Sequence, residues 1–370
     1  TPLTFRQYQE LIAYLEKNRN SAFELMRIIC MFLIILGHCT LATAENTEPY
    51  LGIMDNTGWL IKSFTVCSVN CFFLLTGYFA DSRKFRLGNV IYMWLKTVFY
   101  SAVIYLIISG ITGVFKGKTF IGYCLPVFCK KYWYMQTYLV AALLMPYLSS
   151  ILERLDRKKH TFLLGILIVF FSLHQTFNKV FVTLDTTQGY GIIWCLVLYA
   201  IGSWIGRYGG VIIKKMHTML WALTYIFISI AIFLSNYLIV RFDIAQGVDS
   251  RGNFYAYNSL TVFLQGVCFF CFFIRLSEKM PYVKAVNILA KNTLAGYLIS
   301  SHPLLIYSLW TCIFELTKFR DRLVIYIISA LSLTAFVLCI CILIDKIIER
   351  IFYKIGIKRM LHRVDGVVMF

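Results

Sequence analysis

The sequence predicts an all-α protein, a polytopic transmembrane helix bundle of about ten spans. Of its 370 residues, 59% are hydrophobic and only 15% are charged, whereas soluble domains carry about 45–50% apolar and about 25% charged residues. The apolar residues lie in runs of about 20, the length that crosses the hydrocarbon core of a lipid bilayer as a helix. These runs continue almost from end to end, so we expect one membrane domain without a separate soluble domain.

Ten segments are long and apolar enough to span the bilayer. They lie at 22–42, 59–80, 88–112, 132–150, 161–177, 190–206, 218–240, 257–275, 285–308 and 323–346. The first 20 residues are polar and charged, and no small-residue cleavage site follows the first apolar run. We therefore expect no cleavable signal peptide.

The distribution of basic residues predicts the orientation, because Lys and Arg are enriched in cytoplasmic loops. With the N-terminus inside, the outer loops hold 10 of the 36 basic residues, and the inner segments hold 22 when Arg275 and Lys346, the last residues of their spans, are counted with them. The outer loop 44–58 contains three acidic residues and no basic one, although the next outer loop carries four lysines. We predict that both termini are cytoplasmic.

The net charge of +18 and the twelve cysteines have plain explanations in a membrane protein. The charge follows from the loop bias rather than from nucleic-acid binding, so we expect no nucleic-acid partner. Cys268 and Cys271 have the C-x-x-C spacing of some metal sites, but they lie in an apolar helix without nearby polar ligands, so we expect no metal. Cys124 and Cys129 share an outer loop, and the sequence leaves their pairing open.

The first span contains three ionisable residues, which are costly inside a bilayer. Glu24 and Arg27 are three residues apart and share a helix face, so they can pair. His38 follows Arg27 by eleven residues, which places it on nearly the same face and about 16 Å further along the axis. Arg27 alone could snorkel to the inner surface, and His38 alone could bond to a neighbouring helix. Neither explanation accounts for both residues lying on one stripe.

The second and ninth spans also contain polar residues. Lys291 and His302 are eleven residues apart in the ninth span, so His302 is expected at a depth similar to that of His38. In the second span, Asn70 is an amide that needs partners within the membrane. Gly77 permits close helix approach, and we interpret it as a packing residue.

Two further motifs lie at the expected membrane surfaces. Arg83 and Arg86, in the short loop after the second span, can bind a phosphate with forked hydrogen bonds, or can simply follow the positive-inside rule. Trp133, Tyr134 and Tyr138 open the fourth span. They form either an interfacial aromatic belt or a surface on which sugar rings stack.

Together these segments resemble the membrane acyltransferase-3 family. The first helix of that family carries a Glu-x-x-Arg-x10-His pattern, matched by Glu24, Arg27 and His38. Its second helix ends in a Phe-Phe-x-x-Ser-Gly-Tyr-like segment, matched at 72–78 with Thr76 in place of Ser. An Arg-x-x-Arg pair follows in the next inner loop, as Arg83 and Arg86 do here.

Two later segments extend this resemblance. The family has a helix with a Trp-aromatic start that ends near a Pro, as 133–147 does. The family's Tyr-Leu-x-His-Pro is similar to Tyr-Leu-Ile-Ser-Ser-His-Pro at 297–303, which has two extra residues before His302. The resemblance covers residues 20–350 and is weakest between 160 and 280.

The resemblance implies an enzyme in the cell (inner) membrane that moves an acyl group, usually acetyl, from cytoplasmic acetyl-CoA to a sugar hydroxyl. The acceptor would be a cell-surface polysaccharide or its lipid-linked precursor. The resemblance also implies three parts of the chain: a cytoplasmic segment at 1–20, a transmembrane acyltransferase domain at 21–350 and a basic cytoplasmic tail at 351–370. A thioester is already activated, so no metal is required.

A mechanism can be assigned to these residues on the basis of the resemblance. His38 would act as general base on the acceptor hydroxyl, or would carry the acetyl group itself, since imidazole titrates near neutral pH. Glu24 would hold Arg27 in place. Arg83, Arg86 and Lys291 would bind the acyl-CoA. The residues that would contact the reacting groups or the acceptor are Asn70, Trp133, Tyr134, Tyr138 and His302.

Two functions of other classes remain open from the sequence. Intramembrane Arg and His also mark transport pathways, so the protein could carry a small anionic metabolite. Many transporters have repeated halves with matching Gly or Pro breaks, however, and no such pairing is found here. A structural subunit without chemistry would leave the buried ionisable stripe unexplained.

Overall fold

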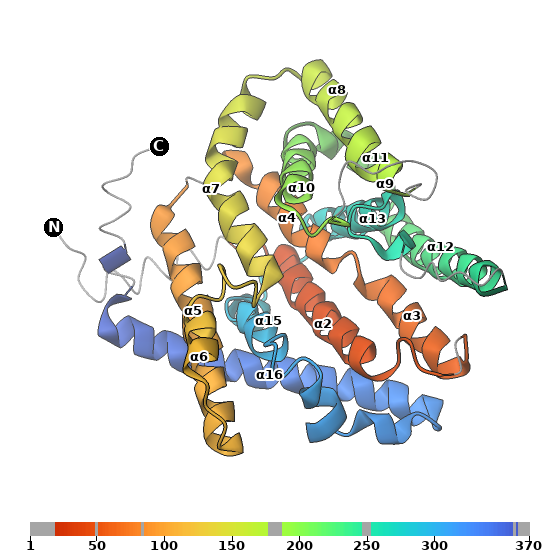
Figure 1. The fold of residues 1–370 in the computed structure, drawn as a ribbon. Coiled ribbons are helices and arrows are strands. Elements are labelled where there is room, and N and C mark those ends of the chain that lie inside the picture. The colour runs from red at the N-terminus through yellow and green to blue at the C-terminus, as the bar shows by residue number, and fades with distance from the viewer. Residues whose placement is uncertain are drawn as a thin grey trace.

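The computed structural model describes residues 19–48, 51–82, 85–176, 187–245, 253–357 and 360–361. Within these residues every regular element is helical, which confirms the predicted all-α class. Figure 1 shows a bundle in which α2 (Ser21–Thr43) lies near the centre, with α16 (Leu323–Ile355) running beside it. The side chain of Asn20 caps the first turn of α2 by accepting from the backbone N–H of Ala22, at 3.0 Å.

The remaining helices are shorter or interrupted in several places. In chain order the α-helices are α3 (Ile53–Thr65), α4 (Ser68–Tyr78), α5 (Leu87–Thr112), α6 (Gly117–Cys124), α7 (Trp133–Glu153), α8 (Arg157–Ile168), α9 (His174–Thr176), α10 (Ile192–Trp204), α11 (Gly210–Lys215), α12 (Thr218–Ala245), α13 (Leu260–Ser277), α14 (Lys284–Ala290) and α15 (Leu294–Ser300). Three π-helical segments lie at Val169–Leu173, Ile205–Gly209 and Leu309–Ile313. Short 3₁₀ turns lie at Ala80–Ser82, Asn253–Tyr255 and Leu316–Phe319.

Eight helices in the described residues are long and apolar enough to cross a membrane, counting α3 with α4 and α10 with α11 as single spans. They correspond to eight of the ten expected segments. The other two are α8 to α9, where a π-helical segment interrupts the helix, and the ninth segment, which breaks between α14 and α15. The predicted count of ten is therefore not confirmed.

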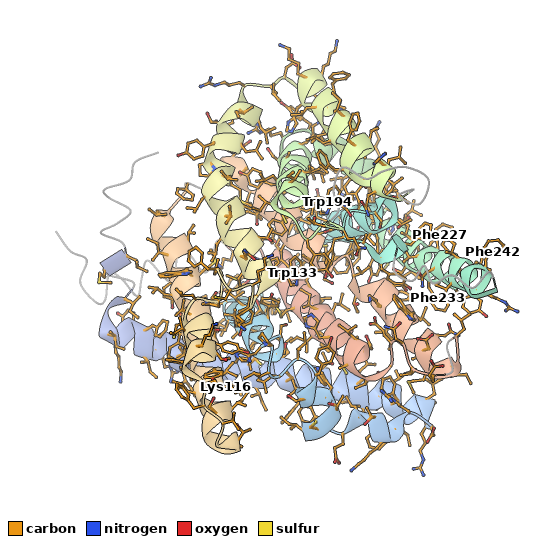
Figure 2. The ribbon with its side chains drawn as sticks, in the orientation of Figure 1. Lys116, Trp133, Trp194, Phe227, Phe233 and Phe242 are labelled. Carbon is orange, nitrogen blue, oxygen red and sulfur yellow. The ribbon has the colours of Figure 1, made fainter. Side chains whose placement is uncertain are left out.

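Apolar side chains cover much of the outer surface, as expected for a protein in contact with lipid. Figure 2 shows Phe227, Phe233 and Phe242 along α12, at one edge of the bundle. Phe227 is 72% exposed and Phe242 is 65% exposed. Such a surface would be costly in water but is favourable against hydrocarbon chains.

Hydrogen bonds join the helix ends into two groups. In one group, the start of α2 bonds to the end of α13, and the turn after α4 bonds to the segment after α10 (Asn20 to Ser277, 3.1 Å; Arg207 to Asp81, 2.7 Å). In the other, the end of α2 bonds to α16, and α7 bonds to the segment before α10 (Thr43 to Tyr326, 2.7 Å; Thr137 to Tyr190, 3.0 Å). This grouping agrees with helices that alternate in direction, while the cytoplasmic location of the termini stays a prediction.

Glycines bring α4 and α10 into close contact. A Cβ atom added to Gly77 would lie 2.0 Å from the carbonyl oxygen of Tyr199, and one added to Gly202 would lie 2.2 Å from that of Leu74. Only hydrogen fits in these positions, because the two backbones nearly touch. The interpretation of Gly77 as a packing residue is confirmed.

A buried polar network ties α5 to α16 and to the break between α14 and α15. Lys96 Nζ lies 2.6 Å from Asp345 Oδ2 and 3.0 Å from Glu349 Oε1. The Tyr100 hydroxyl donates to Asp345 Oδ1 at 2.7 Å, and the Asn292 amide donates to Oδ2 at 2.7 Å. Since a buried carboxylate must be paired and hydrogen-bonded, these partners fix the position of the break.

Candidate active site

The ion pair predicted on α2 is present. Arg27 donates to Glu24 Oε1 through one terminal nitrogen at 2.7 Å, and Glu24 is only 4% exposed. Arg19 adds a second cation, with its Nε 3.8 Å from the same oxygen. The start of α2 therefore carries two guanidinium groups around one buried carboxylate, an arrangement with an excess of positive charge.

His38 lies on the same helix, three turns beyond Arg27. Its side chain is half-buried, and its Nδ1 lies 3.0 Å from the hydroxyl oxygen of Ser301. Ser301 directly follows α15, where the chain turns away from the helix. When Ser301 accepts from Nδ1–H, Nε2 keeps a free lone pair, which is the form of imidazole that acts as a base or nucleophile.

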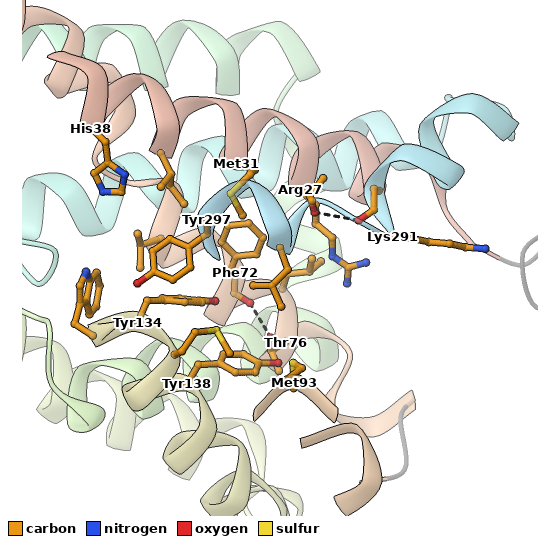
Figure 3. Close-up of a pocket in the computed structure, with 18 of the residues that line it drawn as sticks. Arg27, Met31, His38, Phe72, Thr76, Met93, Tyr134, Tyr138, Lys291 and Tyr297 are labelled. Atoms are coloured by element: carbon orange, nitrogen blue, oxygen red, sulfur yellow. Dashed lines mark hydrogen bonds between the residues drawn. The ribbon is translucent and has the colours of Figure 1, made fainter. Parts of the chain in front are cut away.

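A cavity of about 290 Å³ joins Arg27 to His38. We call it the basic cavity, because Arg19, Arg27 and Lys291 line it. Figure 3 shows Arg27 and Lys291 at one end and His38 at the other. The walls between them are apolar and aromatic, and they include Met31, Phe72, Tyr134, Tyr138 and Tyr297.

A second cavity, of about 270 Å³, meets the basic cavity at His38. We call it the ion-pair cavity, because Glu45 and Lys62 line it and lie 2.7 Å apart. The two cavities share five lining residues, namely Ile34, His38, Val69, Trp133 and Tyr257. The imidazole therefore borders both spaces.

A third cavity, of about 540 Å³, lies against α4, α5 and α7. We call it the side cavity. Arg86, an exposed residue just before α5, lines it. It shares Thr76, Met93 and Tyr138 with the basic cavity, so the two adjoin. The other predicted phosphate-binding arginine, Arg83, lies outside the described residues.

The structure brings together most of the predicted site residues. Glu24 pairs with Arg27 from outside the cavities. The predicted site residues that line the cavities are Arg27, His38, Arg86, Trp133, Tyr134, Tyr138 and Lys291. The aromatic group at the start of α7 thus contributes to the interior walls. Whether it contacts an acceptor stays a prediction.

Asn70 and His302 lie outside these three cavities. The Asn70 amide donates to the backbone oxygen of Tyr257 at 2.8 Å, and its oxygen accepts from Trp194 at 3.4 Å. His302 is fully buried, with Nε2 3.3 Å from the backbone oxygen of Ser101 and its ring stacked on Tyr123. Asn70 thus fixes a residue that lines two cavities. Substrate contact by Asn70 or His302 stays a prediction.

Sequence reasoning missed several residues that the structure places at the site: Glu45, Lys62, Tyr257, Tyr297 and Ser301. Ser301 belongs to the 297–303 segment, which has two residues more than the family pattern. In the structure, the side chain that bonds to His38 is that of Ser301, the residue before His302. Glu45 and Lys62 are 17 residues apart on different segments, and no sequence periodicity links them.

The cysteines lie apart from these cavities. Cys268 and Cys271 are buried in α13, and the described structure gives both as free thiols. Cys124 and Cys129, in and after α6, are free as well.

The fold and these connected cavities define a multi-pass membrane protein with an internal polar site. The model of the acyltransferase domain family matches residues 20–346, and the chain belongs to the acyltransferase-3 family of membrane acyltransferases. No curated protein and no solved structure matches the chain. This membership favours acyl transfer over the transporter alternative.

Proposed function

We propose that this protein is an O-acetyltransferase of the cell (inner) membrane. It moves an acetyl group from cytoplasmic acetyl-CoA to a hydroxyl of a cell-surface polysaccharide or its lipid-linked precursor. The observation that carries the proposal is the position of His38, which borders a cavity lined by cations and a second cavity with balanced charges.

The basic and side cavities suit an acyl-CoA. Its nucleotide end is anionic, and Arg27, Lys291 and Arg86 supply cations on these two cavities. The pantetheine arm is slim and mostly apolar, which fits the aromatic and aliphatic walls. An extended arm that begins near Arg27 reaches His38 over about 16 Å, the rise of eleven helical residues.

In the proposed reaction, the acceptor oxygen attacks the thioester carbonyl carbon. His38 Nε2 takes the hydroxyl proton, the new C–O bond forms and the C–S bond breaks. The leaving thiolate then takes the proton from the imidazolium, so that free CoA and an acetyl ester result. Attack by Nε2 itself, followed by transfer to the hydroxyl, uses the same geometry, and quenching with labelled acetyl-CoA distinguishes the two routes by trapping acetyl-histidine.

Removal of the imidazole tests this proposal. Purified wild-type protein is expected to bind acetyl-CoA and to hydrolyse it slowly, with water in place of the acceptor. His38→Ala should retain binding and lose hydrolysis by at least about 100-fold, the usual contribution of a general base. His217→Ala, at an exposed histidine before α12, is the control and should behave as wild type.

Two results would contradict the proposal. Undiminished hydrolysis by His38→Ala would show that His38 takes no part in the reaction. Failure of the well-folded wild type to bind acetyl-CoA would exclude it as donor. The Arg83→Ala/Arg86→Ala double variant tests the arginines proposed to bind the nucleotide end of acetyl-CoA. It should bind acetyl-CoA more weakly while remaining folded.

A further inference from the structure

Glu45 and Lys62 form a built polar site rather than a surface ion pair. The Glu45 side chain is 1% exposed and that of Lys62 is 28% exposed. Thr40 donates to Glu45 Oε1 at 3.3 Å, and Lys62 Nζ lies 4.4 Å from the centre of the Trp59 ring. Burying two charges is costly, and an apolar pair of similar size is often as stable. Their position on a cavity beside His38 suggests a ligand-binding role.

The two cavities that meet at His38 differ in charge. The basic cavity is lined by three cations, Arg19, Arg27 and Lys291, and the described lining contains no carboxylate. The charged residues that line the ion-pair cavity are Glu45 and Lys62, whose charges cancel. The first cavity therefore favours an anionic ligand, whereas the second favours an uncharged one.

Aromatic side chains complete the ion-pair cavity. The ring centres of Trp133 and Tyr190 lie 4.4 Å apart, those of Tyr190 and Tyr257 4.9 Å apart, and those of Trp133 and Tyr257 5.5 Å apart. All three residues line the cavity. Aromatic rings pack against the C–H faces of a sugar, while a carboxylate and an ammonium group bond its hydroxyls. The volume, about 270 Å³, suits a single sugar ring rather than an oligosaccharide.

We infer that the ion-pair cavity is the acceptor subsite, that it takes one uncharged sugar residue, and that Glu45 and Lys62 select this residue by bonding its hydroxyls. This inference rests on the proposed function and narrows it. The reacting hydroxyl gives its proton to His38 and receives the acetyl group, so the acceptor needs no charge of its own. A uronic acid or other anionic sugar would place its carboxylate near Glu45 without an unpaired cation to receive it.

Methyl glycosides of glucose, galactose and mannose, each beside its uronic acid counterpart, are suitable probes. The purified protein is given labelled acetyl-CoA and each probe, and the labelled sugar ester is measured. Acetylation of at least one uncharged glycoside is expected, at a rate at least about tenfold above that of its uronic acid, because the carboxylate would be buried without a partner. Faster acetylation of the uronic acids, or no ester on any uncharged glycoside while acetyl-CoA is still hydrolysed, would overturn the inference.

Variants of the pair test its residues. Glu45→Gln and Lys62→Met each leave one charge unpaired and can disturb folding, so the decisive variant is the neutral Glu45→Gln/Lys62→Met double. It should raise KM for the glycoside at least about tenfold while acetyl-CoA binding stays at the wild-type level. Glu48→Gln and Lys118→Met, at exposed positions, are the matched controls.

The outcomes separate this inference from the function on which it rests. An unchanged KM in the folded double variant would show that the pair is structural and would overturn the inference alone. Failure of the folded wild-type protein to bind acetyl-CoA would overturn the proposed function. Loss of acetyl-CoA binding only in the double variant would place the pair at the donor site and would also overturn the inference.

Discussion

At the residue scale, the contact between His38 and Ser301 decides which imidazole nitrogen can react. The hydroxyl of Ser301 lies 3.0 Å from Nδ1. A neutral imidazole carries its proton on the nitrogen whose partner accepts it, so Ser301 favours the tautomer with a free Nε2. Ser301 is in this sense a positioning residue for the proposed base.

Ser301→Ala should therefore slow the reaction without weakening donor binding. We expect kcat for acetyl-CoA hydrolysis to fall by about tenfold, which corresponds to one lost hydrogen bond of about 1.4 kcal/mol, while KM changes little. Ser301→Thr, which keeps the hydroxyl, should recover most of the rate. Ser308→Ala, which removes an exposed hydroxyl on the same segment, is the control. Equal losses in Ser301→Ala and Ser301→Thr would contradict a hydrogen-bond role.

Sequence patterns predicted that Arg27 and His38 share one face of a helix, but missed the side-chain contacts that Ser301 and Lys62 make with residues of other segments. Arg27 and His38 follow from helical geometry alone, since eleven residues return nearly to the same face. Ser301 reaches His38 only because α15 packs against α2, and Lys62 reaches Glu45 only because the chain reverses between α2 and α3. Such contacts depend on tertiary packing, which has no periodic signal in the sequence.

At the element scale, the break between α14 and α15 places a cation on the basic cavity. Lys291 lies in the break between α14 and α15, and the adjacent Asn292 donates to Asp345 on α16. The Lys96–Asp345 network thereby holds the segment that carries one cation of the basic cavity. The predicted helix at 285–308 missed this break, because hydropathy measures apolar content and does not detect an interruption of backbone hydrogen bonds.

Three continuous helices were predicted more accurately. The expected segments 22–42, 88–112 and 132–150 agree with α2, α5 and α7 within about three residues. Their ends coincide with clear signals, such as the Asn20 cap and the αL glycine at 113 after α5. The sequence carries such local signals, whereas the π-helical segments depend on how neighbouring helices pack.

The contact between α4 and α10 makes a prediction at the same scale. Gly77→Ala forces the two backbones apart, because its Cβ would lie 2.0 Å from the Tyr199 oxygen. We expect a loss of about 1–3 kcal/mol of stability or more, seen as a lower midpoint of thermal unfolding in detergent. Gly165→Ala, where an added Cβ meets nothing within 4 Å, should unfold as wild type does. Equal midpoints for the two variants would contradict close packing at Gly77.

At the scale of the whole molecule, the basic cavity and the ion-pair cavity follow one another along α2 and differ in charge. The basic cavity begins at the start of α2 and the ion-pair cavity lies toward its end, with His38 between them. Hydrogen bonds between helix ends place these two ends of α2 in different groups. For the proposed acetyltransferase, we therefore expect the donor and the acceptor to approach His38 from opposite sides of the membrane.

Labelling from one side tests the predicted orientation of the two cavities. Cys129, after α6, is exposed and belongs to an expected outer loop, whereas Lys158, in α8, is exposed in an expected inner loop. In right-side-out vesicles, a membrane-impermeant maleimide should modify Cys129 without permeabilisation, as located by mass spectrometry. In the Cys129→Ser background, Lys158→Cys should react only after the vesicles are opened. The reverse labelling pattern would show that the protein has the opposite orientation in the membrane. The basic cavity would then lie on the side without acetyl-CoA, which would contradict acetyl-CoA as the donor.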